Sequence, residues 1–110
     1  MFINSPKPPY YAAIFTSELK TGVNDDYSEM AEEMAALAEK QPGYLGIDSV
    51  RDADGLGITI SYWQSEEDIL QWKQNARHKV AQKLGLTQWY KTFSLRICKV
   101  ERDRFFPNAK

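Results

Sequence analysis

His78 is the residue of this chain that is best suited to acid–base chemistry. It is the only histidine among 110 residues, and histidine is the side chain whose ordinary pKa lies near neutral pH. If the helix expected around it is continuous, the imidazole points away from the apolar side of that helix. If Asn75 instead caps a new helical segment, His78 lies in its first turn and ties down that turn. We therefore consider His78 both as a general base and as a structural residue.

Aromatic and charged side chains supply further candidates for contact with a bound small molecule. The four that we select for a substrate pocket are Trp72, Tyr62, Met34 and Arg96. Tyr62 offers a phenolic hydroxyl, and Arg96 offers a permanent positive charge. Each also has a structural alternative: Trp72 and Met34 suit a core, and Tyr62 suits cross-strand packing. Arg96 suits an ion pair with Glu101 or with an acid of a partner subunit.

Composition argues against several other classes of function. Lys and Arg number 14 and Asp and Glu number 15, for a net charge of -1, so no basic surface predicts nucleic-acid binding. No apolar run approaches the ~20 residues of a membrane span, and residues 1–9 do not resemble a signal peptide. Cys98 is the only cysteine, which fits a reducing cytoplasm. No spacing predicts a metal site or a phosphate-binding loop, so we expect neither a metal nor a cofactor.

Hydrophobic periodicity and turn residues divide the chain into six elements. Proline-rich residues 1–9 form an expected extended arm, and residues 103–110 form an expected tail. The chain between them, 10–102, is one expected domain. Helix two begins after Ser65, with Asp68 at the capping-box position, and ends before Gly85, with a break expected near residues 73–75. The other expected elements are a strand at 10–18, a helix at 26–40, strands at 44–51 and 56–63, and a strand at 92–100.

The order βαββαβ with a central hairpin predicts a ferredoxin-like α+β fold. Right-handed crossovers place both helices on one face of a four-stranded antiparallel sheet and leave the other face bare. An apolar sheet face does not normally stay in water, so we expect a homodimer that packs sheet on sheet. We expect Trp63, with Phe15 or Tyr11, to lie on the face that meets the partner. The arm and the tail should then lie across the neighbouring subunit.

Several motifs together resemble the antibiotic biosynthesis monooxygenase family of the dimeric α+β barrel superfamily. They are Pro42–Gly46, Tyr62–Glu67, Trp72–Gln82, Trp89–Tyr90 and Arg96–Arg102. The resemblance covers roughly residues 10–102 and implies a homodimeric barrel with outer helices and a ligand cleft between sheet and helices. It also implies, as one activity of such proteins, oxidation of small aromatic or quinol-type substrates by molecular oxygen without a cofactor.

The resemblance leaves three hypotheses about function. The first is a cofactor-independent monooxygenase in which the substrate anion supplies electrons to oxygen. The second is a non-catalytic dimeric module that binds a small molecule or is associated with stress, because one scaffold hosts several functions. The third is haem degradation. Haem-degrading relatives carry an Asn on the first strand, whereas residues 10–18 contain none, and His78 falls about a turn too early to match their haem ligand.

Overall fold

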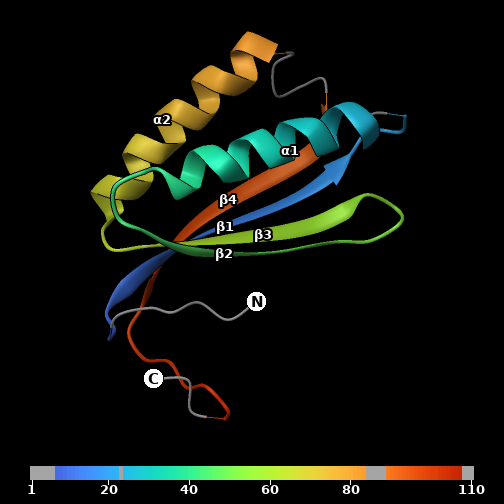
Figure 1. Cartoon of the computed structure of the whole chain (residues 1–110). Helices are drawn as coiled ribbons and strands as arrows, with labels where there is room; N and C mark the ends of the chain where they lie inside the picture. The colour runs from blue at the N-terminus through green and yellow to red at the C-terminus, as the bar shows by residue number, and fades with distance from the viewer. Residues whose placement is uncertain (1–6, 23, 84–88, 108–110) are drawn as a thin grey trace.

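The structure, a computed structural model, describes residues 7–22, 24–83 and 89–107, with only the backbone given for residues 24–26 and 77–83. The elements of this part of the chain are β1 (Tyr10–Leu19), α1 (Asn24–Glu39), β2 (Tyr44–Arg51), β3 (Leu56–Trp63), α2 (Glu66–Lys83) and β4 (Tyr90–Val100). The strands form one antiparallel sheet in the order β2-β3-β1-β4. Both helices lie on the same face of this sheet (Figure 1). The predicted ferredoxin-like α+β fold is confirmed.

The start of α2 is fixed by the predicted cap. The Ser65 hydroxyl oxygen accepts a hydrogen bond from the backbone N–H of Asp68 at 3.1 Å and donates to Asp68 Oδ2 at 2.9 Å. Asp68 also lies against the turn before β2, where a Cβ on Gly43 would come within 1.9 Å of Asp68 Oδ2. The φ of Gly43 is +81°, which a glycine adopts without strain. The loop after α1 therefore packs closely against the first turn of α2.

The predicted break in α2 near residues 73–75 is wrong. The helix is continuous from Glu66 to Lys83. Asn75 does not cap a second segment; its side-chain amide donates to Gln41 Oε1 at 2.9 Å, in the loop after α1. A polar residue in the middle of a helix can serve a tertiary contact instead of a cap, and the sequence does not distinguish the two.

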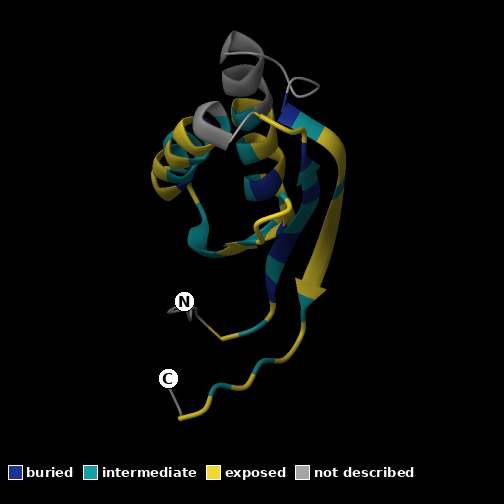
Figure 2. Ribbon diagram, turned by 90° about the vertical axis from the view of Figure 1, so that its right-hand side faces the viewer, coloured by how far each residue is buried: buried dark blue, intermediate teal, exposed yellow. Residues whose placement is uncertain are grey.

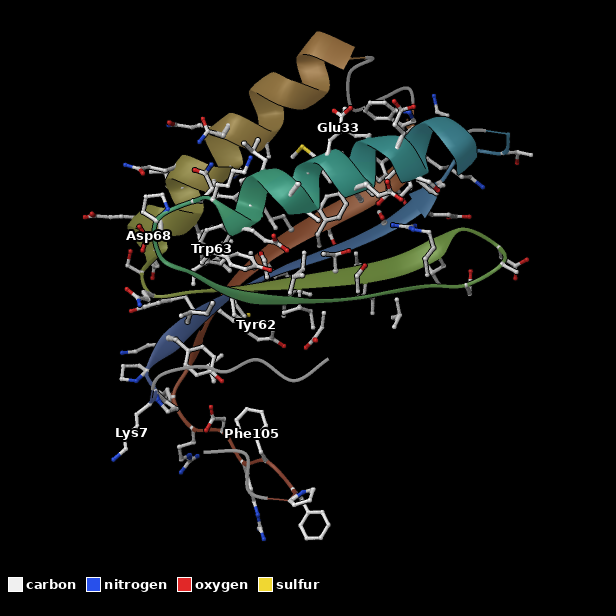
Figure 3. All side chains as sticks on the ribbon, in the orientation of Figure 1. Lys7, Glu33, Tyr62, Trp63, Asp68 and Phe105 are labelled. Carbon is white, nitrogen blue, oxygen red and sulfur yellow. The ribbon has the colours of Figure 1, made fainter. Side chains whose placement is uncertain are left out.

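The position of Trp63 also differs from the expectation. Trp63 is 0% exposed and lies on the helix-facing side of the sheet, in a cluster with Ala13, Ala38 and Ile69. Figure 3 shows it between the sheet and the helices, with Tyr62 on the other side. Alternation along β3 separates two sets of side chains but does not say which set the helices cover. The face expected to meet a partner is therefore the opposite one.

The helix-free face of the sheet is largely apolar. Alternation and register place the even-numbered residues of β1 and β3 on this face, with those of β4 from Thr92 onward and Asp48 and Val50 of β2. Val50, Leu56 and Ile58 are exposed there, Val50 to 61%. The chain that follows β4 touches one end of this face, where the Tyr10 hydroxyl donates to Asp103 Oδ2 at 2.7 Å.

Candidate functional site

A polar network lies between the sheet and the first half of α1, and Arg51 is its centre. Arg51 stands at the end of β2 on the helix-facing side. Its Nη2 donates to Ser17 Oγ at 2.7 Å and to the Tyr27 hydroxyl oxygen at 3.1 Å. Its Nη1 donates to the backbone carbonyl oxygens of Gly55 at 2.5 Å and Ser17 at 3.4 Å. The guanidinium also lies over the Tyr27 ring, with Cζ 4.9 Å from the ring centroid.

Close packing holds this guanidinium in place from the side of β3. A Cβ on Gly57 would lie only 2.6 Å from Arg51 Cζ. Glycine at position 57 therefore leaves the space that the arginine head occupies. Ser17 lies on β1, the strand on the other side of β3, and is buried. The hydrogen bond from Arg51 Nη2 therefore gives a partner to a hydroxyl that water does not reach.

Tyr27 and Tyr90 form a hydrogen-bonded pair beside Arg51. Burial raises the pKa of the Tyr90 hydroxyl far above its ordinary value, and the neighbouring Tyr27, with which it is hydrogen-bonded, raises this pKa further. The positive charge of Arg51 lowers the pKa of Tyr90 by a smaller amount. Because its pKa is raised, Tyr90 stays protonated and neutral at physiological pH.

The Tyr27 oxygen accepts a hydrogen bond from the Arg51 guanidinium and is also hydrogen-bonded with Tyr90. Because the guanidinium is a cation, its hydrogen bond polarises the Tyr27 O–H as a donor.

Aromatic rings surround the tyrosine pair. Phe15 contacts Tyr90 edge to face, with centroids 5.3 Å apart, and packs against Phe93 at 5.5 Å. Tyr90 contacts Tyr27 at 5.6 Å and Phe93 at 5.7 Å. We call Phe15, Tyr27, Tyr90 and Phe93, together with Arg51, the aromatic–arginine cluster. A planar aromatic molecule with an anionic oxygen matches this combination of rings, donors and positive charge.

An apolar core supports the cluster from the α1 side. Leu19, Met30 and Trp89 are buried together, and Met34 packs against them. The indole Nε1 of Trp89 is buried, and among the described residues it has no hydrogen-bond partner. A buried N–H without an acceptor is costly.

The cluster borders an open apolar strip on β4. Phe93, Leu95 and Ile97 pair with Ser17, Phe15 and Ala13 of β1 and so lie on its helix-facing side. All three are exposed, Phe93 to 48%. Figure 2 shows β4 as the exposed edge, away from the two helices. Through Phe93 the cluster is therefore continuous with an apolar surface that is exposed at this edge.

The structure does not bring the five predicted site residues together. Met34 lies beside the aromatic–arginine cluster. Trp72 belongs to the other core cluster, where it stacks on Trp63 with centroids 6.0 Å apart. Tyr62 and Arg96 lie on the helix-free face. The side chain of His78 lies outside the described residues.

Arg96 is exposed in the single chain, and its Nη1 donates to Ser94 Oγ at 2.9 Å. Sequence reasoning missed Arg51, Tyr27 and Tyr90 as a group. Alternation along β2 places Arg51 on the side of Ile47, but no pattern in the sequence connects it with α1 and β4. Among the described residues, no group of three or more His, Cys, Asp or Glu side chains is arranged to hold a metal ion. No helix in the described ranges is long and apolar enough to cross a membrane.

Comparison with known proteins agrees with this geometry. The model of the family described as "Antibiotic biosynthesis monooxygenase" matches residues 10–84. The chain is 47% identical over 102 residues to the uncharacterized protein YqjZ of Bacillus subtilis (strain 168), which covers 93% of this chain and 89% of YqjZ.

Two solved structures share the fold at low sequence identity. PA3566 from Pseudomonas aeruginosa matches with a TM-score of 0.68 and 17% identity, over 91% of this chain and all of that chain (100%). SnoaB, a cofactor-independent oxygenase from Streptomyces nogalater, matches with a TM-score of 0.73 and 12% identity, over 92% of this chain and 100% of that chain. At such identities the likeness concerns the fold.

Proposed function

Since the chain belongs to the antibiotic biosynthesis monooxygenase family, we propose that it is a cofactor-independent oxygenase of small aromatic, quinol-type substrates. The observation that carries the proposal is the aromatic–arginine cluster. It combines aromatic rings with a cation and hydroxyl donors, and it borders an open apolar strip. The oxygenase SnoaB, which shares the fold, supports the same class of reaction.

The proposed reaction uses the substrate as its own reductant. A base removes a proton from an activated CH₂ group beside a phenol or quinol ring. The resulting anion delivers electrons to O₂, one oxygen atom ends as a carbonyl on that carbon, and the other leaves as water. Written as a whole, R₂CH₂ and O₂ give R₂C=O and H₂O.

The cluster supplies stabilisation for the anion. The Tyr27 O–H, polarised by Arg51, donates to the developing oxyanion, and the exposed ring of Phe93 gives the substrate an aromatic surface. Met34 stays in this proposal as a further apolar contact, whereas Trp72 supports the other core cluster. Tyr90 is not the base, because its pKa is raised and it stays protonated at neutral pH. His78 remains the base that we propose.

The decisive experiment measures oxygen consumption with a panel of anthrone-like and quinol substrates, for the parent protein and a Tyr27→Phe variant. Loss of one oxyanion donor is expected to lower turnover by about 10²-fold. Tyr10→Phe makes the same chemical change on the opposite face and is expected to retain turnover. Parent protein that binds none of these compounds and consumes no oxygen contradicts the proposal.

One observation favours a second candidate, a binding module without catalysis. Among the described residues of the cluster, Arg51 is a cation and Tyr90 is held protonated, so neither acts as a base at neutral pH. A binding module predicts quenching of tryptophan fluorescence by quinols without any oxygen uptake. Oxygen uptake by the parent separates the two candidates, and in the oxygenase His78→Ala is expected to abolish this uptake.

We further propose that the protein works as a homodimer in the cytoplasm. The helix-free face presents exposed Val50, Leu56 and Ile58, which a second subunit would cover. Cys98, as the only cysteine, forms no internal disulfide, which suits a reducing compartment. Light scattering at micromolar concentration tests the dimer: a mass near 12.7 kDa, that of one chain, contradicts it.

A further inference from the structure

Two opposite charges lie at the two edges of the helix-free face, in the same row. Cross-strand pairing joins Asp48 to Ile60, Ile60 to Ile14, and Ile14 to Arg96. The row therefore runs across the sheet from an acid on β2, through two isoleucines, to a base on β4. Because β2 and β4 are the outer strands, these two charges do not meet within one subunit.

Among the residues that the structure describes, neither charge forms an ion pair with its own chain. Asp48 Oδ2 accepts a hydrogen bond from the Tyr62 hydroxyl at 3.0 Å, and no Lys or Arg of this part of the chain pairs with the carboxylate. Within the described residues, the hydrogen bond of the Arg96 side chain is the one to Ser94 Oγ. A guanidinium has five donor hydrogens, so most of them remain for another acceptor.

We propose that Asp48 pairs with Arg96 of the partner subunit, once at each edge of a two-fold interface between helix-free faces. This inference rests on the proposed homodimer and adds the orientation of the two subunits. A two-fold axis that runs parallel to the strands between β1 and β3 places β2 opposite β4 of the partner. Each row of cross-strand neighbours then faces the same row of the partner. Asp48 then lies opposite the partner's Arg96, in both directions.

The sizes of the facing side chains support the same axis. It sets Tyr62 of β3 opposite Ala12 of the partner subunit, and Val50 of β2 opposite Ser94 of the partner subunit. Large side chains thus face small ones, as close packing between two sheets requires. The Ile60–Ile14 pairs form an apolar centre between the two charged edges.

The alternative axis is disfavoured by charge. An axis perpendicular to the strands at the level of this row places each strand opposite its own copy. Asp48 then faces Asp48 of the partner subunit, and Arg96 faces Arg96 of the partner subunit. Like charges that face each other across an interface destabilise it. The charge pattern therefore selects the axis parallel to the strands.

The test uses charge reversal and sedimentation equilibrium with the full chain. Asp48→Arg alone, or Arg96→Asp alone, creates two like-charge contacts, and each is expected to raise the dimer Kd by about 100-fold or more. When the two variants are mixed in equal amounts, both contacts of the mixed dimer become complementary. We expect this mixture to form a heterodimer, visible by native mass spectrometry, with a Kd close to that of the parent.

Two matched variants serve as controls. Lys99→Asp makes a similar charge change on β4 but on the helix-facing side, and Glu67→Arg reverses an exposed acid on α2. Both are expected to dimerise like the parent. Equal weakening by these controls overturns the proposal, because net charge would then explain the effect.

The remaining outcomes separate this proposal from the proposed dimer. A parent that is a monomer contradicts both. A parent dimer whose Kd is unchanged by either reversal, or reversal variants that do not combine when mixed, overturns the pairing and leaves the dimer intact. If circular dichroism shows that a reversal variant is unfolded, Asp48→Asn and Arg96→Gln replace the pair. Their combined effect on Kd is then expected to be smaller than the product of the single effects, and a simple product overturns the proposal.

Discussion

On its helix-facing side the sheet carries a cation, Arg51, whose guanidinium donates to Ser17, Tyr27 and Gly55 of its own chain. On its helix-free side it carries an acid, Asp48, which is hydrogen-bonded to Tyr62 and forms no ion pair among the described residues. The first face is closed by helices, and α1 contributes Tyr27 as a partner of Arg51. The second face has charges and apolar side chains that a single subunit does not complete. The difference indicates that one face is organised for a small molecule and the other for a second chain.

The largest effect is expected where the helix-facing side is most tightly packed. Trp63→Ala removes a fully buried ring that stacks on Trp72 and packs against Ala38 and Ile69. We expect a loss of about 3–5 kcal/mol in the free energy of unfolding, measured by chemical denaturation. Phe106→Ala, at an 88% exposed position, is the control and should change this free energy by less than about 0.5 kcal/mol. Similar losses for the two variants would contradict the assignment of the faces.

A smaller effect is expected from the polar network of the same face. Arg51→Ala leaves the buried Ser17 hydroxyl without its donor and should cost about 1–3 kcal/mol of unfolding free energy. In a Ser17→Ala background the same change should cost less, because the orphaned hydroxyl is gone. Urea denaturation of the four variants of this cycle measures the coupling. Strictly additive losses would show that Arg51 does not stabilise the fold through Ser17.

How far the sequence predicts this molecule differs between backbone and site. Strands 44–51 and 56–63 were predicted with the bounds that β2 and β3 have, because a clear Asp-Gly turn and strict alternation define them locally. The face assigned to Trp63 was wrong, since alternation is symmetric and the choice depends on where α2 folds back. The predicted break in α2 was wrong because the Asn75 side chain does not cap a helix but hydrogen-bonds to Gln41, 34 positions away.

The aromatic–arginine cluster shows the same limit more strongly. Its members come from β1, α1, β2 and β4, and no short spacing connects them. Arg51 carries no motif, and its partners are identified only by the cross-strand register and the path of α1. Met34 was selected for a substrate pocket, and its helical periodicity explains only why it lies on the buried side of α1, beside this region.

On the helix-free face, substitution is expected to affect association more than folding. Ile58→Asn replaces an exposed apolar side chain, so unfolding of the dilute protein should change by less than about 1 kcal/mol. In a dimer the same change buries an unpaired amide. The unfolding midpoint of the parent should rise with protein concentration, and this rise should disappear in the variant. Leu70→Asn, at an exposed leucine on α2, should keep the concentration dependence, and its loss in both variants would contradict a dimer through the helix-free face.

The smallest effect concerns pH and the bond between Tyr62 and Asp48. Burial, followed by the hydrogen bond and the negative charge of Asp48, raises the pKa of Tyr62 from 10.0 to about 12. The folded chain therefore holds this proton to higher pH than the unfolded chain does. Tyr62 contributes stability that is complete below pH 10 and is lost as the pH rises from about 10 to about 12. Because the side chain is partly exposed, solvent screening should keep this contribution below about 1 kcal/mol.

Comparison of variants isolates this contribution from that of the other tyrosines, since burial raises the pKa of Tyr44 and Tyr90 as well. The difference in unfolding free energy between the parent and Tyr62→Phe should shrink as the pH rises from 10 to 12. Asp48→Asn keeps an oxygen acceptor but removes the charge, so the absorbance titration of Tyr62 should move toward its ordinary pKa. A difference that stays constant over this range would mean that Tyr62 titrates alike in the folded and unfolded chains. The Asp48 carboxylate would then have no charged interaction with Tyr62, and its charge would be free for the pairing across the two-fold axis.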